Sequence, residues 1–285
     1  MTTDDLAADP DVPVPDAHDP IARVTTDLSD DRANGLRRFN LVMAALHAVS
    51  GTAMVAFGDT GFGLPVTAFN LNGPPGTSID NGVLDELFSV PLAVGTASFL
   101  WLSAIFHLIV GTVGFDRYID ELRHGRNRFR WVEYSVSSTL MIVLIALVTN
   151  ITDIAALIAI AVVNASMILF GWIMEMTNAV GDGQPRWWTP FWFGCIAGIG
   201  PWTAIAAAII GGQTIDGADQ PPGFVYGIIV TVFLLFNCFA IVQWLQYRGN
   251  GKWADYVVGE RVYVVLSLVA KSLLAWQIFA NTLIE

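Results

Sequence analysis

Seven long apolar runs are the feature of this sequence that most limits what the chain can fold into. Each run approaches the ~17–25 residues that an α-helix needs to cross the hydrocarbon core of a bilayer. A backbone inside lipid must satisfy its own hydrogen bonds, which favours helices over open sheets. The sequence therefore predicts an all-α integral membrane protein, a bundle of seven transmembrane helices over residues 39–58, 91–114, 131–149, 153–174, 191–210, 223–245 and 262–284.

The composition agrees with a membrane protein. Of the 285 residues 54% are hydrophobic and only 14% are charged, whereas soluble domains average ~25% charged residues. The acidic, proline-containing residues 1–35 lack the apolar core of a signal peptide, and they predict a flexible tail ahead of a membrane domain at 36–285. The net charge of −11 argues against nucleic acid as a partner. Cys195 and Cys238 fall inside the apolar runs, where they suit packing rather than a disulfide or a metal site.

The basic residues predict the orientation in the membrane. The connections at 59–90, 150–152 and 211–222 contain no lysine or arginine. By the positive-inside rule, the N-terminus is cytoplasmic and the C-terminus is extracellular. The basic residues that share the cytoplasmic side are Arg23, Arg32, Arg37, Arg38, Arg117, Arg123, Arg126, Arg128, Arg130, Arg186, Arg248, Lys252 and Arg261.

One lysine does not follow this distribution, because it interrupts the last apolar run, VLSLVAKSLLAWQIF. Counted from Arg261, Lys271 lies about 15 Å into the helix, near the middle of the bilayer. A charged lysine at that depth costs several kcal/mol unless it is paired or neutral. Lys271 could therefore be neutral, ion-paired or covalently modified, and a desolvated amine readily forms a Schiff base.

Few other ionisable residues share that depth. Counted from the outer ends of their helices, Glu133 and Lys271 agree within about one turn, which makes Glu133 the candidate partner if its helix extends past Arg130. His47 and His107 approach the same level from the cytoplasmic side. Ser103 lies one turn from His107, and Ser267 lies one turn from Lys271. These residues predict a polar cluster in the cytoplasmic half, with hydrogen-bonded packing as the alternative interpretation for each histidine.

Several specific sequence blocks occur in order along the chain. They are RWVEYSVSSTLMIVLIA (130–146), VNASMILFGW (163–172), FWFGCIAGI (191–199), PGFVYGII (222–229) and LSLVAKSLLAWQIF (266–279), with LNGPPGT (71–77) in the long outer loop. In this order the blocks resemble the heliorhodopsin family. The resemblance covers the second to seventh runs and most of the first, and it leaves the N-terminal tail uncovered.

The resemblance implies a seven-helix photoreceptor with a short β-ribbon in the first extracellular loop. Lys271 would bind all-trans retinal as a protonated Schiff base, with Glu133 as its counterion. The residues His47, His107 and Ser103 would form a cluster that accepts the released proton. The chromophore would also be surrounded by Tyr134, Ser137, Asn164, Met167, Gly171, Phe236, Gln243, Ser267 and Trp276. Ordinary helix packing is the alternative for the residues of this last set that carry aromatic, methionine or glycine side chains.

The function expected from these residues is that of a light sensor without enzymatic activity. A proton pump needs paired intramembrane acids on both sides of the lysine, and only Glu133 lies deep. A light-gated channel or transporter remains the alternative, and a transporter without a chromophore is a third reading. A homodimer and an unidentified cytoplasmic signalling partner are also expected. Gly194 and Gly198 form a GxxxG pattern that suits either a dimer face or packing within one chain.

Overall fold

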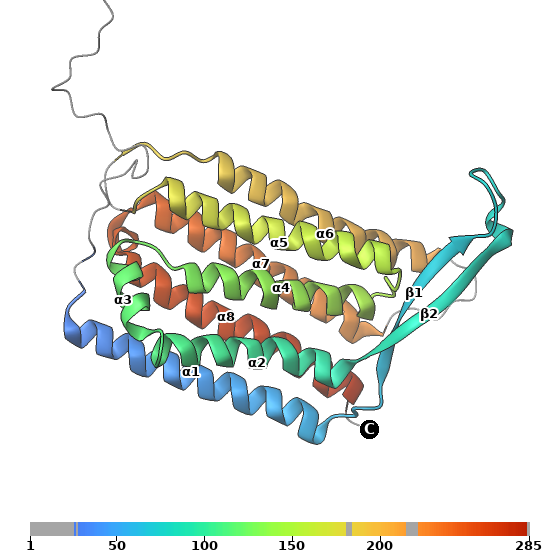
Figure 1. Ribbon diagram of the computed structural model, residues 1–285, viewed down its shortest axis with the longest axis horizontal. Coiled ribbons are helices and arrows are strands. Elements are labelled where there is room, and N and C mark those ends of the chain that lie inside the picture. Colours follow the sequence, from blue (N-terminus) through green and yellow to red (C-terminus); the bar gives the residue numbers. More distant parts are fainter. Residues whose placement is uncertain (1–25, 27, 181–183, 215–221, 284–285) are drawn as a thin grey trace, which may run out of the picture.

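The computed structural model describes residues 26, 28–180, 184–214 and 222–283. Seven long helices and one short helix make up most of this part of the chain, together with a two-stranded ribbon (Figure 1). The helices are α1 (Asp30–Phe57), α2 (Leu92–Gly111), α3 (Phe115–Arg123), α4 (Arg128–Val148), α5 (Ile154–Thr177), α6 (Thr189–Gln213), α7 (Gly223–Arg248) and α8 (Tyr256–Ile278). The strands are β1 (Gly63–Leu71) and β2 (Gly82–Pro91), and short turns are η1 (Ile79–Asn81), η2 (Gly251–Ala254) and the π-helical η3 (Phe279–Leu283).

Seven of these helices, all except α3, are long and apolar enough to cross a membrane. Many large apolar side chains point outward from them, including Val162 on α5, Ile196 on α6 and Leu234 on α7. Such exposure would be costly in water but suits contact with lipid. The predicted class, a polytopic seven-helix membrane protein, is therefore confirmed.

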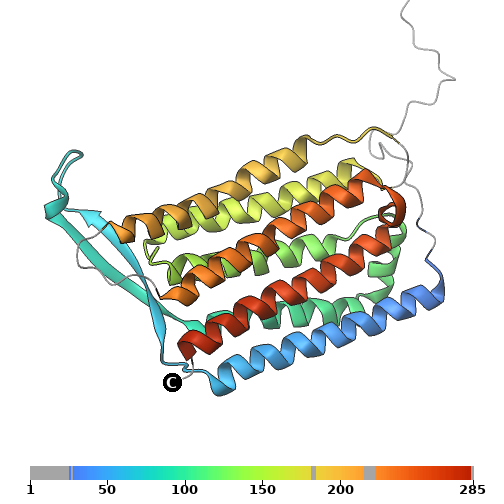
Figure 2. The same ribbon diagram turned by 180° about the vertical axis from the view of Figure 1, so that it is seen from behind.

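The long helices lie side by side, and the two ends of the bundle differ (Figures 1 and 2). The ribbon projects from one end, beside the last described turn of the chain, and α3 caps the opposite end. We call these the ribbon end and the α3 end. The ribbon end encloses an apolar core that includes Met54, Leu92 and Leu147. The α3 end combines apolar residues with tyrosines such as Tyr118 and Tyr256.

Capping residues set where several helices begin. Asn127 accepts a hydrogen bond from the Arg130 amide at 3.0 Å, and Asp153 accepts one from the Ala156 amide at 3.0 Å. Both side chains satisfy amide groups that a helix start leaves unpaired. The cap at Asn127 starts α4 ahead of Arg130, so the third span extends inward as the pairing of Glu133 requires.

The first helix begins earlier than the sequence predicts. Ser29 caps α1 by accepting from the Arg32 amide, and Asp30 and Asp31 occupy the first turn, where acidic residues stabilise the helix dipole. Residues 30–35, expected in the flexible tail, are therefore helical. The rest of the predicted tail, apart from residues 26, 28 and 29, lies outside the described residues.

The predicted β-ribbon is confirmed, and its base is attached to the bundle. The strands pair antiparallel, with an irregularity between Val66 and Thr67. At this point Val66 enters the apolar core, and the Thr67 amide donates to the Thr152 carbonyl at 2.9 Å. The base is thereby held to the α4–α5 connection. Phe88, which pairs with Val66, and Leu84, nearer the tip of the ribbon, remain exposed.

Candidate functional site: a buried lysine–glutamate pair between two cavities

The centre of the site is an ion pair between α8 and α4. Lys271 Nζ lies 2.7 Å from Glu133 Oε1, and both side chains are almost fully buried. Ser267, one turn earlier on α8, accepts a hydrogen bond from Nζ at 2.8 Å. Ser103 on α2 donates to Glu133 Oε1 at 2.6 Å. Each charged group therefore has a serine hydrogen bond in addition to the ion pair. These hydrogen bonds offset part of the free-energy cost of burying both charges.

An apolar cavity begins at the Lys271 amine and lies among α4, α5, α7 and α8. About 400 Å³ of space, part of it open to the outside, lies among its lining atoms, and its walls are mostly apolar. Of the residues expected around the chromophore, Tyr134, Ser137, Met167, Phe236 and Ser267 line it together with Lys271. The other lining residues are Ser138, Met141, Ile168, Phe239 and Ala270.

Three further predicted residues stand behind the cavity wall instead of lining it. Gln243 on α7 donates to the Gly171 carbonyl at 3.1 Å, which joins α7 to α5. A side chain at Gly171 would meet the Trp131 ring at 2.6 Å, so glycine allows α5 to approach this ring closely. Asn164 donates to Ser138 and Thr139 of α4 at 2.9 and 3.0 Å. These contacts hold together the helices that form the cavity.

Trp276 is placed differently from the expectation that it lies beside the chromophore. Its side chain is 43% exposed, and its ring packs edge-on against Phe279 with centroids 5.4 Å apart. Five positions along an α-helix rotate a side chain by roughly 140°, which turns Trp276 away from the face of Lys271. Trp276 therefore lies on the outer surface of α8 and not at the cavity.

The GxxxG pattern of α6 packs within the chain. A side chain at Gly198 would meet Met167 Sδ at 2.7 Å, and one at Gly194 would meet the Met167 carbonyl and Phe170 at 3.4 Å. Both glycines therefore face α5. Of the two interpretations of this pattern, close packing between neighbouring helices of one chain is the one that the geometry supports.

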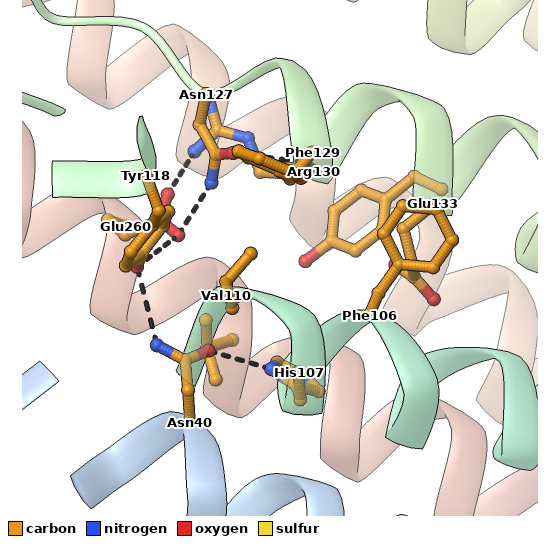
Figure 3. A pocket seen from close by; sticks show the side chains of 12 residues that line it. Asn40, Phe106, His107, Val110, Tyr118, Asn127, Phe129, Arg130, Glu133 and Glu260 are labelled. Carbon is orange, nitrogen blue, oxygen red and sulfur yellow. Dashed lines mark hydrogen bonds and ion pairs between the residues drawn. The ribbon is translucent and has the colours of Figure 1, made fainter. Parts of the chain in front are cut away.

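A second cavity reaches Glu133 from the α3 end (Figure 3). About 350 Å³ of space, part of it open to the outside, lies among its lining atoms, and polar residues line much of it. His107 lines this cavity, and its Nδ1 lies 2.8 Å from Asn40 Oδ1. The His47 ring stacks on His107 with centroids 5.6 Å apart. Neither ring nitrogen of His47 has a hydrogen-bond partner among the described residues. The predicted cluster of His47, His107 and Ser103 thus lies on the α3 side of the ion pair.

Sequence reasoning missed a second buried ionic cluster at the far side of this cavity. Arg130, predicted in a connecting loop, is buried in α4, where Nη2 lies 2.7 Å from Glu175 Oε2 and Nη1 lies 2.9 Å from Glu260 Oε2. The apolar runs exclude all three residues because they fall at helix ends. Helical spacing could have predicted that Arg130 and Glu260 face inward. Arg130 lies one turn from Glu133, and Glu260 lies about three turns from Lys271, so each pair shares a helix face.

Two solved structures show what class of protein this fold defines. The transmembrane domain of the Salpingoeca rosetta rhodopsin phosphodiesterase superposes with a TM-score of 0.63 at 15% identity, over 90% of this chain and 88% of that chain. The light-driven proton pump LR (Mac) from Leptosphaeria maculans gives a TM-score of 0.60 at 14% identity, over 90% and 97% of the two chains. No curated protein matches this chain by sequence. The chain therefore has the fold of the microbial rhodopsins.

The family follows from the sequence match. The heliorhodopsin family model matches residues 36–283, and the chain belongs to this family. It is therefore a retinal-binding, light-responsive protein that passes through the membrane several times, and the family is generally non-enzymatic. The site suits retinal, because an amine with its own carboxylate stands at the head of a mostly apolar cavity.

Proposed function

We propose that this protein is a light sensor in which Lys271 Nζ holds all-trans retinal through a protonated Schiff base. Bound retinal would supply light absorption and the change of shape that follows it. The polyene would occupy the apolar cavity, whose walls include Met167 and Phe236. Glu133 would stabilise the positive charge at Nζ, because a buried cation needs one nearby anion. Ser103 and Ser267 would hold the two charged groups in register.

The proposal that the protein senses light without pumping ions rests on where its buried carboxylates lie. Among the described residues, these are Glu121, Glu133, Glu175 and Glu260. Glu133 is level with Lys271, and the other three belong to the α3 end, while the ribbon end encloses an apolar core. A proton released at Nζ would therefore move toward His107 and His47, because no buried acid of the described residues lies on the ribbon side. One-sided movement of this kind produces a signal but no net transport.

We also propose that the α3 end and the N-terminus are cytoplasmic. The exposed arginines of α3 and its neighbours, such as Arg117 and Arg123, support this orientation through the positive-inside rule. The exposed apolar side chains of β2 make the ribbon the proposed contact for a second protomer. The signalling partner would then meet the α3 end.

Spectroscopy with added all-trans retinal tests this function. The wild-type protein should develop a visible band that Lys271→Ala lacks, whereas Lys252→Ala, which changes a lysine of η2, should retain it. A wild type without a visible band would exclude the chromophore site. Illumination of cells in unbuffered suspension should cause no sustained change in pH. A sustained change that a protonophore abolishes would identify a pump, and a steady photocurrent would identify a channel.

A further inference from the structure

Two exposed arginines lie close together where α1 adjoins α8. The two helices run side by side, with α8 in red next to α1 in blue (Figure 2). Arg261 of α8 reaches across to α1, because its Nη2 lies 3.8 Å from where a Cβ atom at Gly35 would stand. Arg38 follows Gly35 by three positions, a spacing that puts Cβ atoms about 5–6 Å apart on a helix surface. The junction of the two helices therefore carries two guanidinium groups.

Acidic side chains do not neutralise these two arginines. Neither Arg38 nor Arg261 forms an ion pair or a side-chain hydrogen bond with any other residue that the structure describes. Asp255, at the start of α8, is paired with Arg32. Asp31 shares the outer side of α1 with Arg38 but lies two turns earlier, about 10 Å along the axis. Even with Asp31 counted, two positive charges against one negative leave the junction positive.

The two arginines lie at the depth of lipid headgroups. Arg261 precedes Lys271 by ten positions, which is about 15 Å of helix. This distance is half of the ~30 Å hydrocarbon core, and Lys271 lies near its middle. Because the Arg261 side chain reaches α1 at Gly35, Arg38 stands near the same level. Both guanidinium groups are therefore placed at the boundary between hydrocarbon and headgroups.

Apolar side chains continue from each arginine toward the ribbon end. Val42 and Val49 follow Arg38 on the outer side of α1, and both are exposed. Val265 lies one turn after Arg261 on α8 and is also exposed. Arginine binds phosphate through paired, charge-assisted hydrogen bonds, and acyl chains pack on aliphatic side chains. A positive site above two apolar stripes thus has the chemistry of a phospholipid site.

We propose that Arg38 and Arg261 bind the phosphate of one anionic phospholipid, whose acyl chains lie along Val42 and Val265. An anionic lipid is favoured over a zwitterionic one, because an ammonium group beside the phosphate cancels part of the charge that the arginines attract. In the proposed orientation this lipid belongs to the cytoplasmic leaflet. The site lies on the outer surface of the bundle, so the inference goes beyond light sensing and concerns the protein whether or not retinal is bound.

Native mass spectrometry of the full-length protein with added long-chain phosphatidylglycerol tests the site. Wild type should retain one tightly bound phosphatidylglycerol and bind phosphatidylcholine more weakly. Arg38→Gln/Arg261→Gln should weaken phosphatidylglycerol binding by about tenfold or more, since two charge-assisted contacts are lost. Arg38→Lys/Arg261→Lys retains the charge without the planar guanidinium and should bind with intermediate affinity.

A matched control separates this site from general attraction between basic residues and anionic lipid. Arg117→Gln/Arg123→Gln removes the same charge from exposed positions of α3 and should leave the tightly bound lipid in place. Equal weakening in the two glutamine double variants would show diffuse attraction and overturn the proposal. All variants should unfold at the wild-type temperature in phosphatidylcholine, because exposed arginines without partners contribute little to stability.

Two competitors distinguish a lipid from a simple anion. Neither inorganic phosphate nor dihexanoyl phosphatidylglycerol, at the concentration of the long-chain lipid, should displace it, because both lack the apolar contact along the helices. Displacement by inorganic phosphate would identify a phosphate site alone and contradict the lipid assignment. A wild type that binds the long-chain lipid no better than Arg38→Gln/Arg261→Gln would also contradict it, whether solvent or the acidic residues 1–25 cover the arginines. Because no retinal is added, failure here is separate from failure of the visible band.

Discussion

Lys271 Nζ and Glu133 Oε1 lie 2.7 Å apart although 138 positions of sequence separate their residues. The pair joins α8 to α4 in the middle of the bundle, where an apolar cavity meets a second cavity that several polar side chains line. This position gives the amine an anion on one side and an apolar cavity on the other. The proposed cationic chromophore would need both.

Replacing the Glu133 carboxylate should make the positive charge at Lys271 easier to lose. In Glu133→Gln reconstituted with retinal, we expect a shifted visible band. We also expect deprotonation at a lower pH than in wild type, because the anion that stabilises the cation is gone. A spectrophotometric titration measures this shift. Ser103→Ala retains the carboxylate and should titrate closer to wild type. An unaltered titration in Glu133→Gln would exclude Glu133 as the counterion.

Removing the Arg130 guanidinium should strongly destabilise the fold. Arg130→Gln leaves Glu175 buried without a cation, a change that typically costs about 3–5 kcal/mol. Thermal unfolding in detergent should show a clear loss of stability. Arg117→Gln is the matched control, since its side chain is 66% exposed and lies 3.9 Å from Glu121. Exposed pairs contribute about 0–1 kcal/mol. Equal losses in the two variants would show that the buried cluster carries no special stability.

A methyl group at Gly171 should disturb the packing of α5 against α4. The added Cβ in Gly171→Ala would lie 2.6 Å from the Trp131 ring and 3.3 Å from Gln243 Nε2. Overpacking of this kind typically costs about 1–3 kcal/mol. Gly227→Ala in α7 meets no atom within 4 Å, so it should be neutral or slightly stabilising because alanine favours a helix. Thermal unfolding of the two variants compares them, and a fully stable Gly171→Ala would contradict the tight approach.

The proposed orientation makes the two ends of the bundle accessible from opposite sides. A single cysteine replacing Asp80 in η1 should react with a membrane-impermeant thiol reagent added to intact cells. A cysteine replacing Asp120 in α3 should react only after the membrane is opened. Both positions are exposed in the structure, so accessibility depends on the side of the membrane. Labelling of the Asp120 variant in intact cells would reverse the orientation.

A charge on the exposed face of the ribbon should weaken the proposed dimer. Leu84 is 67% exposed on β2, and Leu84→Lys would place an ammonium group where an apolar contact is expected. Light scattering after chromatography should show a shift from dimer toward monomer, with the visible band retained. Asp85→Lys alters the adjacent residue, whose side chain points to the other face of the ribbon. A wild-type protein that is monomeric in mild detergent and in nanodiscs would exclude this interface.

The sequence was most informative about the residues inside the apolar runs. Lys271 is conspicuous because a primary amine in a membrane helix has few physical explanations, and counting residues from the helix ends places Glu133 at the same depth. The same counting could not assign roles to Arg130, Glu175 and Glu260. Charged residues at the end of a span suit the membrane surface equally well, so their burial depends on which neighbours cover them. Trp276 shows a second limit, since proximity in sequence to Lys271 does not place it on the same helix face.

The sequence by itself determined the number of spans, their class and the presence of one intramembrane amine, because the cost of placing polar groups in lipid depends on composition and length. Only the tertiary structure decided which helices adjoin and which side chains meet between them. Membrane helices are apolar toward lipid as well as toward each other, so hydrophobicity does not reveal their inward faces. Close contacts such as Gly171 with Trp131, and polar contacts such as Arg130 with two glutamates, set those faces instead.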